Sequence, residues 1–137
     1  MVTQLIYISQ PFGFDESMLA GILSSARRNN PRLEITGALI CRHDIYLQLL
    51  EGDAAAIDKL FERIKRDDRH LAVTLLSLVE ADDRLFPEWA MLHDPALSWH
   101  WTEEEVNDGA LFRASTDELQ DIFRHIAGQT VADRPPA

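Results

Sequence analysis

The chain lacks the features of disulfide-bonded, metal-caged and membrane-spanning proteins. Its 137 residues include one cysteine, Cys41, so neither an internal disulfide nor a multi-cysteine metal cage can form. Cys41 lies in an apolar stretch, where a buried reduced thiol is expected rather than a nucleophile. No apolar run approaches the roughly 20 residues of a membrane span, and the N-terminus does not resemble a signal peptide. We therefore expect a cytoplasmic protein.

Positive charge is also scarce. The chain has 13 Lys and Arg residues against 23 Asp and Glu residues, a formal net charge of −10. Such a field repels polyphosphate backbones and anionic membrane surfaces, so we expect no nucleic-acid partner and no membrane partner. Residues 102–137 alone carry eight acids and three arginines, which makes the end of the chain a separate electrostatic region.

Standard catalytic signatures are missing as well. The sequence has no P-loop, no GxGxxG, no GxSxG and no HExxH motif. Its five histidines are never paired at i, i+4, so a helical zinc site has no support and we expect no metal. Hydrolase and metalloenzyme interpretations therefore start with little support.

What is present is an ordinary apolar content of 46% and a clear alternation of strand-like and helix-like segments. A hairpin turn is expected at His43-Asp44, and helices are expected between Asp15 and Asn29-Asn30-Pro31 and after Gly52-Asp53. The predicted order is β-α-β-β-α-β with a possible extra strand, an α+β ferredoxin-like sheet with two helices on one face. The expected strands are residues 4–9, 33–42, 45–51, 72–79 and 89–92.

The remainder has a helical pattern. Thr102 with Glu105, and Ser115 with Glu118, are two capping-box signatures, so two C-terminal helices are predicted. The second carries an apolar stripe at i, i+3, i+4, i+7, made of Leu119, Ile122, Phe123 and Ile126. We therefore divide the chain into a core at 1–94, a helical extension at 95–130 and a flexible tail at 131–137.

Several polar side chains stand where an apolar core would not need them. Tyr7 and Ser9 share one face of the first strand, and Gln48 lies in the middle of the third. Leaving a polar position of a buried amide unsatisfied costs about 1–3 kcal/mol. Asn29 and Asn30 sit where the first helix ends, where asparagines commonly cap helices. Each residue alone has an ordinary structural explanation, but the complete set in this order does not.

That order resembles the BLUF family of blue-light sensors that use flavin. The likeness runs from Gln4 to about Leu92 and depends on five short pieces in compatible spacing. The pieces are Leu5-Ile6-Tyr7-Ile8-Ser9, Asn29-Asn30-Pro31 with Ile35-Thr36-Gly37, Leu47-Gln48-Leu49-Leu50-Glu51-Gly52, Arg66-Asp67-Asp68-Arg69-His70 and Arg84-Leu85-Phe86-Pro87-Glu88-Trp89-Ala90-Met91.

The resemblance implies a flavin between the two helices, FAD in the family, although no motif distinguishes FAD from FMN. It assigns Gln48 as the bridge between the flavin and Tyr7. Arg69 and His70 match a basic pair near the ribityl and phosphate portion, with Arg63 and Asp67 as weaker candidates. The remaining matches are Ile22 and Ile64 beside the ring, Asn30 at its polar edge and Asn29 next to it.

The resemblance also implies a mechanism. Light makes the flavin an oxidant, Tyr7 supplies an electron and a proton, and Gln48 is left rotated or tautomerised after the charges recombine. Trp89 or Met91 would carry the change outward. Tyr46, on the same strand face as Gln48, could compete as an electron donor.

The expected protein is a photoreceptor without a fused catalytic domain. We expect it to form a homo-oligomer and to signal to a separate effector, with the helical extension serving output or oligomerisation. The alternatives are a flavin-dependent enzyme or a hydrolase on the same fold, and a regulatory module that has lost its chromophore.

Overall fold

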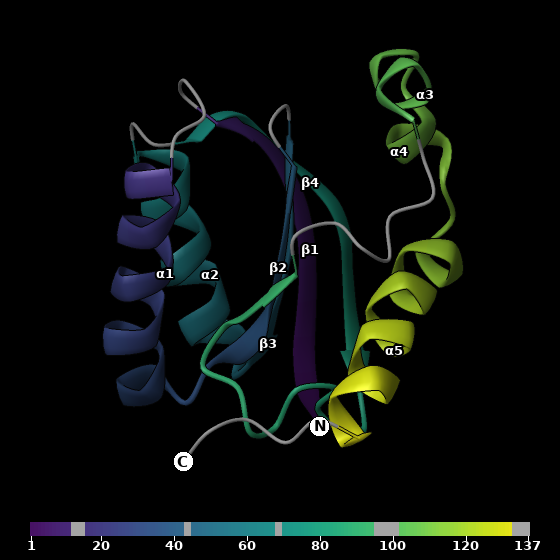
Figure 1. Ribbon diagram of the computed structural model, residues 1–137. Helices are drawn as coiled ribbons and strands as arrows, with labels where there is room; N and C mark the ends of the chain where they lie inside the picture. The colour runs from purple at the N-terminus through teal and green to yellow at the C-terminus, as the bar shows by residue number, and fades with distance from the viewer. Residues whose placement is uncertain (12–15, 43–44, 68–69, 95–101, 133–137) are drawn as a thin grey trace.

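The computed structural model describes residues 1–11, 16–42, 45–67, 70–94 and 102–132 (Figure 1). At its centre is a five-stranded sheet in the order β4-β1-β3-β2-β5. Pairing is antiparallel between the first four strands, and β5 runs parallel to β2. This arrangement confirms the ferredoxin-like α+β class. The strands are β1 (Val2–Pro11), β2 (Thr36–Arg42), β3 (Ile45–Gly52), β4 (His70–Ala81) and β5 (Leu92–Asp94).

Helices cover both faces of the sheet. Figure 1 shows α1 (Glu16–Asn29) and α2 (Ala54–Lys65) side by side on one face, as expected, and α5 (Thr116–Ala132) on the other. Two short helices, α3 (Glu103–Asn107) and α4 (Ala110–Arg113), precede α5. Among the described residues, no helix combines the length and apolarity needed to cross a bilayer.

Strand alternation sorts the apolar side chains into two cores. Leu5 and Tyr7 of β1 point toward α1 and α2, whereas Ile6 and Ile8 point toward α5. On β3, which has no exposed residue, Gln48 shares the register position of Tyr7. Both faces of the central strands are therefore dry, and each polar side chain on them needs a partner inside the protein.

The first helix ends at Asn29, as predicted, but the chain does not become extended there. It continues as a 3₁₀ turn over Asn30–Leu33, with Pro31 in its first half. Glu34 then adopts a left-handed conformation with φ of 55°. The second strand consequently begins at Thr36 rather than at Leu33.

Other boundaries also differ from expectation. The fourth strand runs two residues beyond each end of the expected 72–79, since its pairing with β1 continues there. The fifth strand is Leu92–Asp94 instead of 89–92, and it pairs with β2 at the sheet edge. His43-Asp44 lies outside the described residues, but the pairing of Arg42 with Ile45 confirms the hairpin.

The helical extension has three described helices instead of two. Both capping boxes are confirmed. The hydroxyls of Thr102 and Ser115 accept from the backbone N–H groups three residues on, and the backbone N–H groups of Thr102 and Ser115 donate to the side chains of Glu105 and Glu118. The additional helix is α4, which buries Leu111. Helix α5 runs to Ala132, two residues into the segment expected to be a tail. Its predicted apolar stripe is buried against the sheet.

Gly37 offers a test of this packing. A Cβ built there would lie 2.0 Å from the carbonyl oxygen of Leu49, which belongs to the backbone of β3 and cannot move without disturbing the sheet. We expect Gly37→Ala to lower the free energy of unfolding by about 3 kcal/mol or more.

Gly128 of α5 is the matched control, since a Cβ there meets nothing within 4 Å. Gly128→Ala should leave stability unchanged or raise it by about 0.5–1 kcal/mol. Chemical denaturation of both variants measures the two effects, and equal stabilities would contradict the packing described here.

Candidate functional site

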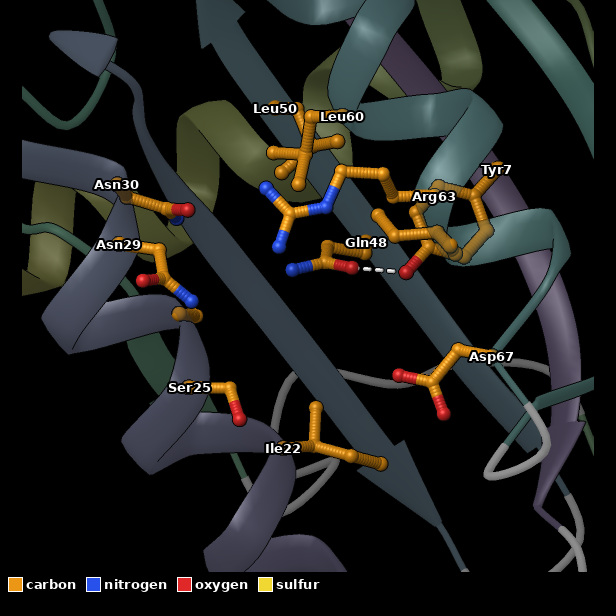
Figure 2. Close-up of a pocket in the computed structure, with 12 residues that line it drawn as sticks. Tyr7, Ile22, Ser25, Asn29, Asn30, Gln48, Leu50, Leu60, Arg63 and Asp67 are labelled. Atoms are coloured by element: carbon orange, nitrogen blue, oxygen red, sulfur yellow. Dashed lines mark hydrogen bonds between the residues drawn. The ribbon is translucent and has the colours of Figure 1, made fainter. Parts of the chain in front are cut away.

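A cavity of about 300 Å³ opens between α1, α2 and the sheet. Its floor is the Tyr7–Gln48 pair of β1 and β3, and its walls come from the two helices (Figure 2). This size lies at the lower end of the range for small-molecule sites. The lining residues are Tyr7, Ile22, Ser25, Ala26, Asn29, Asn30, Gln48, Leu50, Leu60, Arg63, Ile64 and Asp67.

Most of the residues named from the sequence meet at this cavity. Arg69 lies outside the described residues, and His70 belongs to β4 but its side chain is not described. The candidates that line the cavity are Tyr7, Ile22, Asn29, Asn30, Gln48, Arg63, Ile64 and Asp67.

Four residues that line the cavity were not predicted, although helix and strand periodicity could have identified all four. Ser25 and Ala26 follow Ile22 at i+3 and i+4 on α1. Leu60 precedes Ile64 by one helical turn, and Leu50 shares a strand face with Gln48. Once Ile22, Ile64 and Gln48 are assigned to a site, these positions follow from helix and strand geometry.

A hydrogen-bonded path starts at the floor of the cavity. The hydroxyl of Tyr7 donates to Oε1 of Gln48, and Nε2 of Gln48 donates to Sδ of Met91 at 3.1 Å. Tyr7, Gln48 and Met91 are 0%, 4% and 1% exposed. The amide thus accepts on one side and donates on the other, joining a phenol to a thioether in a dry environment.

The environment of Tyr7 keeps its phenol protonated. Burial raises the pKa of Tyr7 well above its ordinary value, and the negative charge of Asp67 raises it further, followed by Tyr46. A neutral phenol holds the proton that it donates to Gln48.

The end of α1 holds the segment that carries Met91. Nδ2 of Asn30, a buried side chain, donates to the carbonyl oxygen of Ala90 at 2.9 Å. Nε of Arg27 donates to the carbonyl oxygen of Met91 at 3.3 Å. In Figure 2, Asn29 and Asn30 lie across the cavity from Tyr7, with Gln48 between them. Asn30 thus lines the cavity and also fixes the neighbouring backbone.

The two candidate output residues lie in different cores. Met91 is buried in the core that contains Tyr7, whereas Trp89 is partly buried and packs against the core that contains α5. Met91 is therefore the one beside Gln48. Tyr46 belongs to the same core as Tyr7, pairs with Ser9 across the sheet, and is not among the cavity-lining residues.

The lining suits a flat heteroaromatic ring with a polar edge. Ile22 of α1 and Ile64 of α2 provide aliphatic walls from the two helices, and Asn29, Asn30 and Gln48 provide amides. Arg63 adds a cation that matches a phosphate-bearing substituent. In the part of the chain that the structure describes, no three His, Cys, Asp or Glu residues gather as metal ligands. The residues present fit a flavin.

Comparison with known proteins gives a consistent result. Residues 2–92 match the model of the family BLUF, "Sensors of blue-light using FAD". Photoactivated adenylate cyclase subunit beta of Euglena gracilis is 35% identical over 127 residues, which are 92% of this chain but only 13% of that protein.

Solved structures agree. The dark-state structure of BlrB, a BLUF protein, has a TM-score of 0.77 at 27% identity and covers 93% of this chain and 96% of its own. Klebsiella pneumoniae BlrP1 with FMN and cyclic diGMP has a TM-score of 0.66 at 28% identity, covering 97% of this chain and 35% of that chain.

The buried phenol makes stability depend on alkaline pH. Because the pKa of Tyr7 is higher in the folded state than in the unfolded state, its contribution is present in full below about pH 10 and is lost as pH rises further. That single proton should remove about 1.4 kcal/mol of unfolding free energy per pH unit above that point.

Denaturation of wild type and Tyr7→Phe between about pH 9 and about pH 11 tests this, since the variant lacks the proton and should lose stability less steeply. Burial raises the pKa of Cys41 to about 11, but Cys41 is present in both proteins, so its contribution to stability cancels in the difference between them. A stability difference that stays constant over this range would contradict the burial of a neutral Tyr7.

Proposed function

This chain belongs to the BLUF family of blue-light sensors, and we propose that Tyr7, Gln48 and Met91 form its light-operated switch beside a bound flavin. The observation that carries the proposal is the hydrogen-bonded path from the phenol through the amide to the thioether. The path runs along the floor of a cavity whose lining suits a flavin ring. The BLUF region is a photosensory module and not a catalytic one.

The proposed flavin-binding residues are those at the cavity together with the basic pair that follows it. Ile22 and Ile64 would flank the ring, and Asn29, Asn30 and Gln48 would bond its polar edge. Arg63 and Asp67 line the same cavity, and Arg69 and His70 follow in sequence. We propose FAD, which the family description names, although BlrP1 has been solved with FMN.

The switch requires no substrate. When bound, a flavin excited by blue light supplies an acceptor for one electron. Tyr7 loses that electron, and its proton passes to Gln48, whose Oε1 already accepts the bond from the hydroxyl. Electron and proton then return to Tyr7, so nothing is consumed. What remains is a Gln48 amide that has rotated or tautomerised.

Rotation of the amide changes what Met91 meets. In the dark arrangement, Nε2 of Gln48 donates to Sδ of Met91. After rotation, the oxygen faces Met91, and a thioether has no proton to donate. The bond between Gln48 and Met91 is lost while Tyr7 gains an N–H donor. The light signal is thus a local exchange of hydrogen bonds that biases the position of Met91.

Replacing the phenol tests the switch. Tyr7→Phe should retain a yellow flavin-bound protein but abolish the small, reversible red shift of its absorption, because no proton is available to Gln48. Spectra before and after blue light measure this. Tyr46→Phe is the matched control, as it removes the second buried phenol of the same core, and it should still photoswitch.

The rival functions give different outcomes. Normal photoswitching of Tyr7→Phe would transfer the electron-donor role to another residue. Flavin reduction by a nicotinamide with turnover of a second substrate would favour a flavin-dependent enzyme. A protein that stays colourless after flavin is supplied would favour a regulatory module without chromophore.

We propose that the output passes to an effector or to a second copy of the chain. In the Euglena cyclase subunit the aligned region is 13% of the protein, so that sensor lies within a larger enzyme. Here β4 is an edge strand that exposes two leucines, Leu75 (44%) and Leu78 (57%). An apolar edge strand is a surface on which a partner chain can pair. A homo-oligomer through this edge is the assembly we favour.

Light scattering in darkness and under blue light tests the output. We expect the mass of the assembly, alone or mixed with a candidate effector, to change on illumination. The flavin-bound Tyr7→Phe protein should show no such change under the same light. Equal masses in every condition for the photoswitching wild type would contradict the proposed output.

A further inference from the structure

The opposite face of β3 contains a second buried polar group. Glu51 follows Gln48 by three residues on this strand, so its side chain lies on the face that packs against α5. It is 0% exposed, although it is a carboxylic acid. An acid at such a position needs several partners to offset its desolvation.

Four donors surround its two oxygens. Oε1 accepts from Nε2 of Gln4 at 3.2 Å and from the backbone N–H of Leu85 at 2.8 Å. Oε2 accepts from the hydroxyl of Thr36 at 2.9 Å and from the backbone N–H of Phe86 at 2.7 Å. Because both oxygens face donors, the deprotonated carboxylate suits this position. Glu51 thereby joins β1, β2 and the connection that follows β4.

Arg84 strengthens the same junction. Its Nη1 donates to the hydroxyl of Thr36 at 2.9 Å and to the carbonyl oxygen of Glu51 at 3.2 Å, and its Nη2 donates to the carbonyl oxygen of Glu34 at 2.6 Å. These bonds tie Arg84 to the backbone of β3 and to the start of β2, next to the bonds of the Glu51 carboxylate. The beginning of the connection is therefore held by two charged side chains, Glu51 and Arg84.

The connection from Arg84 to Met91, which we call the 84–91 segment, has no strand ladder to hold it. Further along, the backbone N–H of Gly37 donates to the carbonyl oxygen of Trp89 at 3.2 Å. Asn30 and Arg27 then bond the carbonyl oxygens of Ala90 and Met91. Glu51, Asn30 and Arg27 all anchor the segment, but Glu51 alone among these three is both fully buried and an ionisable acid or base.

The two ends of the segment reach different cores. Phe86, whose backbone N–H bonds Glu51, packs its ring against Phe123 of α5 with centroids 6.5 Å apart. Met91, at the other end, receives the bond from Gln48. A change in the position of either end is transmitted along a short backbone whose start is fixed at Glu51.

We infer that Glu51 is a positioning residue that holds the 84–91 segment so that Met91 lies against Gln48, and that it thereby sets the rate at which the switch resets. This inference rests on the proposed switch, but its first part concerns the dark structure alone. Glu51 lies across the sheet from the cavity and acts through Met91.

Glu51→Gln is a suitable probe because it keeps the size of the side chain. Its amide would present an NH₂ group either to the N–H of Leu85 or to that of Phe86, and neither backbone group can turn away. One of the two hydrogen bonds from the segment to residue 51 is then replaced by an unfavourable contact between two N–H donors. Glu88→Gln is the matched control, the same change at an exposed position within the segment.

The dark-state test needs no photochemistry. The chain has three methionines, so the Met91 methyl resonance of flavin-loaded protein labelled with ¹³C-methyl methionine is readily assigned with Met91→Leu. Glu51→Gln should shift or broaden this resonance, and Glu88→Gln should leave it unchanged. An unchanged Met91 signal in a folded Glu51→Gln protein would overturn the positioning role, whatever the outcome of the light experiments.

The light test is a double-mutant cycle. Glu51→Gln and Met91→Ala should each slow dark recovery by about fivefold or more, because the bond from Gln48 to Met91 exists only in the dark arrangement and re-forming it favours the return. The double variant should recover no more slowly than Met91→Ala. Additive effects, or a wild-type recovery rate in Glu51→Gln, would overturn the inference.

Two safeguards separate the possible failures. If Glu51→Gln does not fold, Thr36→Val removes one donor while keeping the carboxylate, and it should give a smaller change of the same sign. If wild type does not photoswitch, the proposed function fails, while the methyl signal still decides whether Glu51 positions Met91.

Discussion

The antiparallel register between β1 and β3 is the constraint on which the site depends. It sets Tyr7 opposite Gln48 and Gln4 opposite Glu51. A slip of β3 by one residue would turn Gln48 toward α5 and Glu51 toward α1 and α2, which would leave an amide and a carboxylate facing the wrong cores. This register is favoured because the buried polar side chains of both strands find their partners in it: Tyr7 bonds Gln48 on one face, and Gln4 bonds Glu51 on the other.

The same strand therefore carries polar groups of two kinds. Gln48 accepts one bond and donates one, and rotation of its amide exchanges the two roles. Glu51 accepts from four donors and has no alternative arrangement of comparable quality. On β3, therefore, Gln48 can change its hydrogen-bonding state, while Glu51, three residues further on, holds its surroundings in place. A local switch needs both, since rotation of an amide produces a defined displacement only against a fixed neighbour.

Much of the fold and of the cavity could be predicted from the sequence, and the features that could not be predicted have physical reasons for that. Alternation and helical periodicity predicted the strands, α1, α2 and the stripe of α5, because these patterns follow from burial of one face. Most of the cavity could be named from a resemblance to a family. The 3₁₀ turn after Asn29 was missed, since proline at its start is compatible with this turn as well as with an extended chain. The role of Glu51 was missed because its partners come from segments distant in sequence.

The positions of Trp89 and Met91 show most clearly what the sequence could not predict. Two residues apart, they would share a face if they belonged to the fifth strand, as expected from the sequence. The strand instead begins at Leu92, and the irregular backbone before it sends Trp89 to the core of α5 and Met91 to the core of Tyr7. The 84–91 segment, and not a strand ladder, consequently joins the two cores. Any displacement at Gln48 that reaches α5 by this route must travel through the single hydrogen bonds that hold this segment, and each of those bonds can be altered separately.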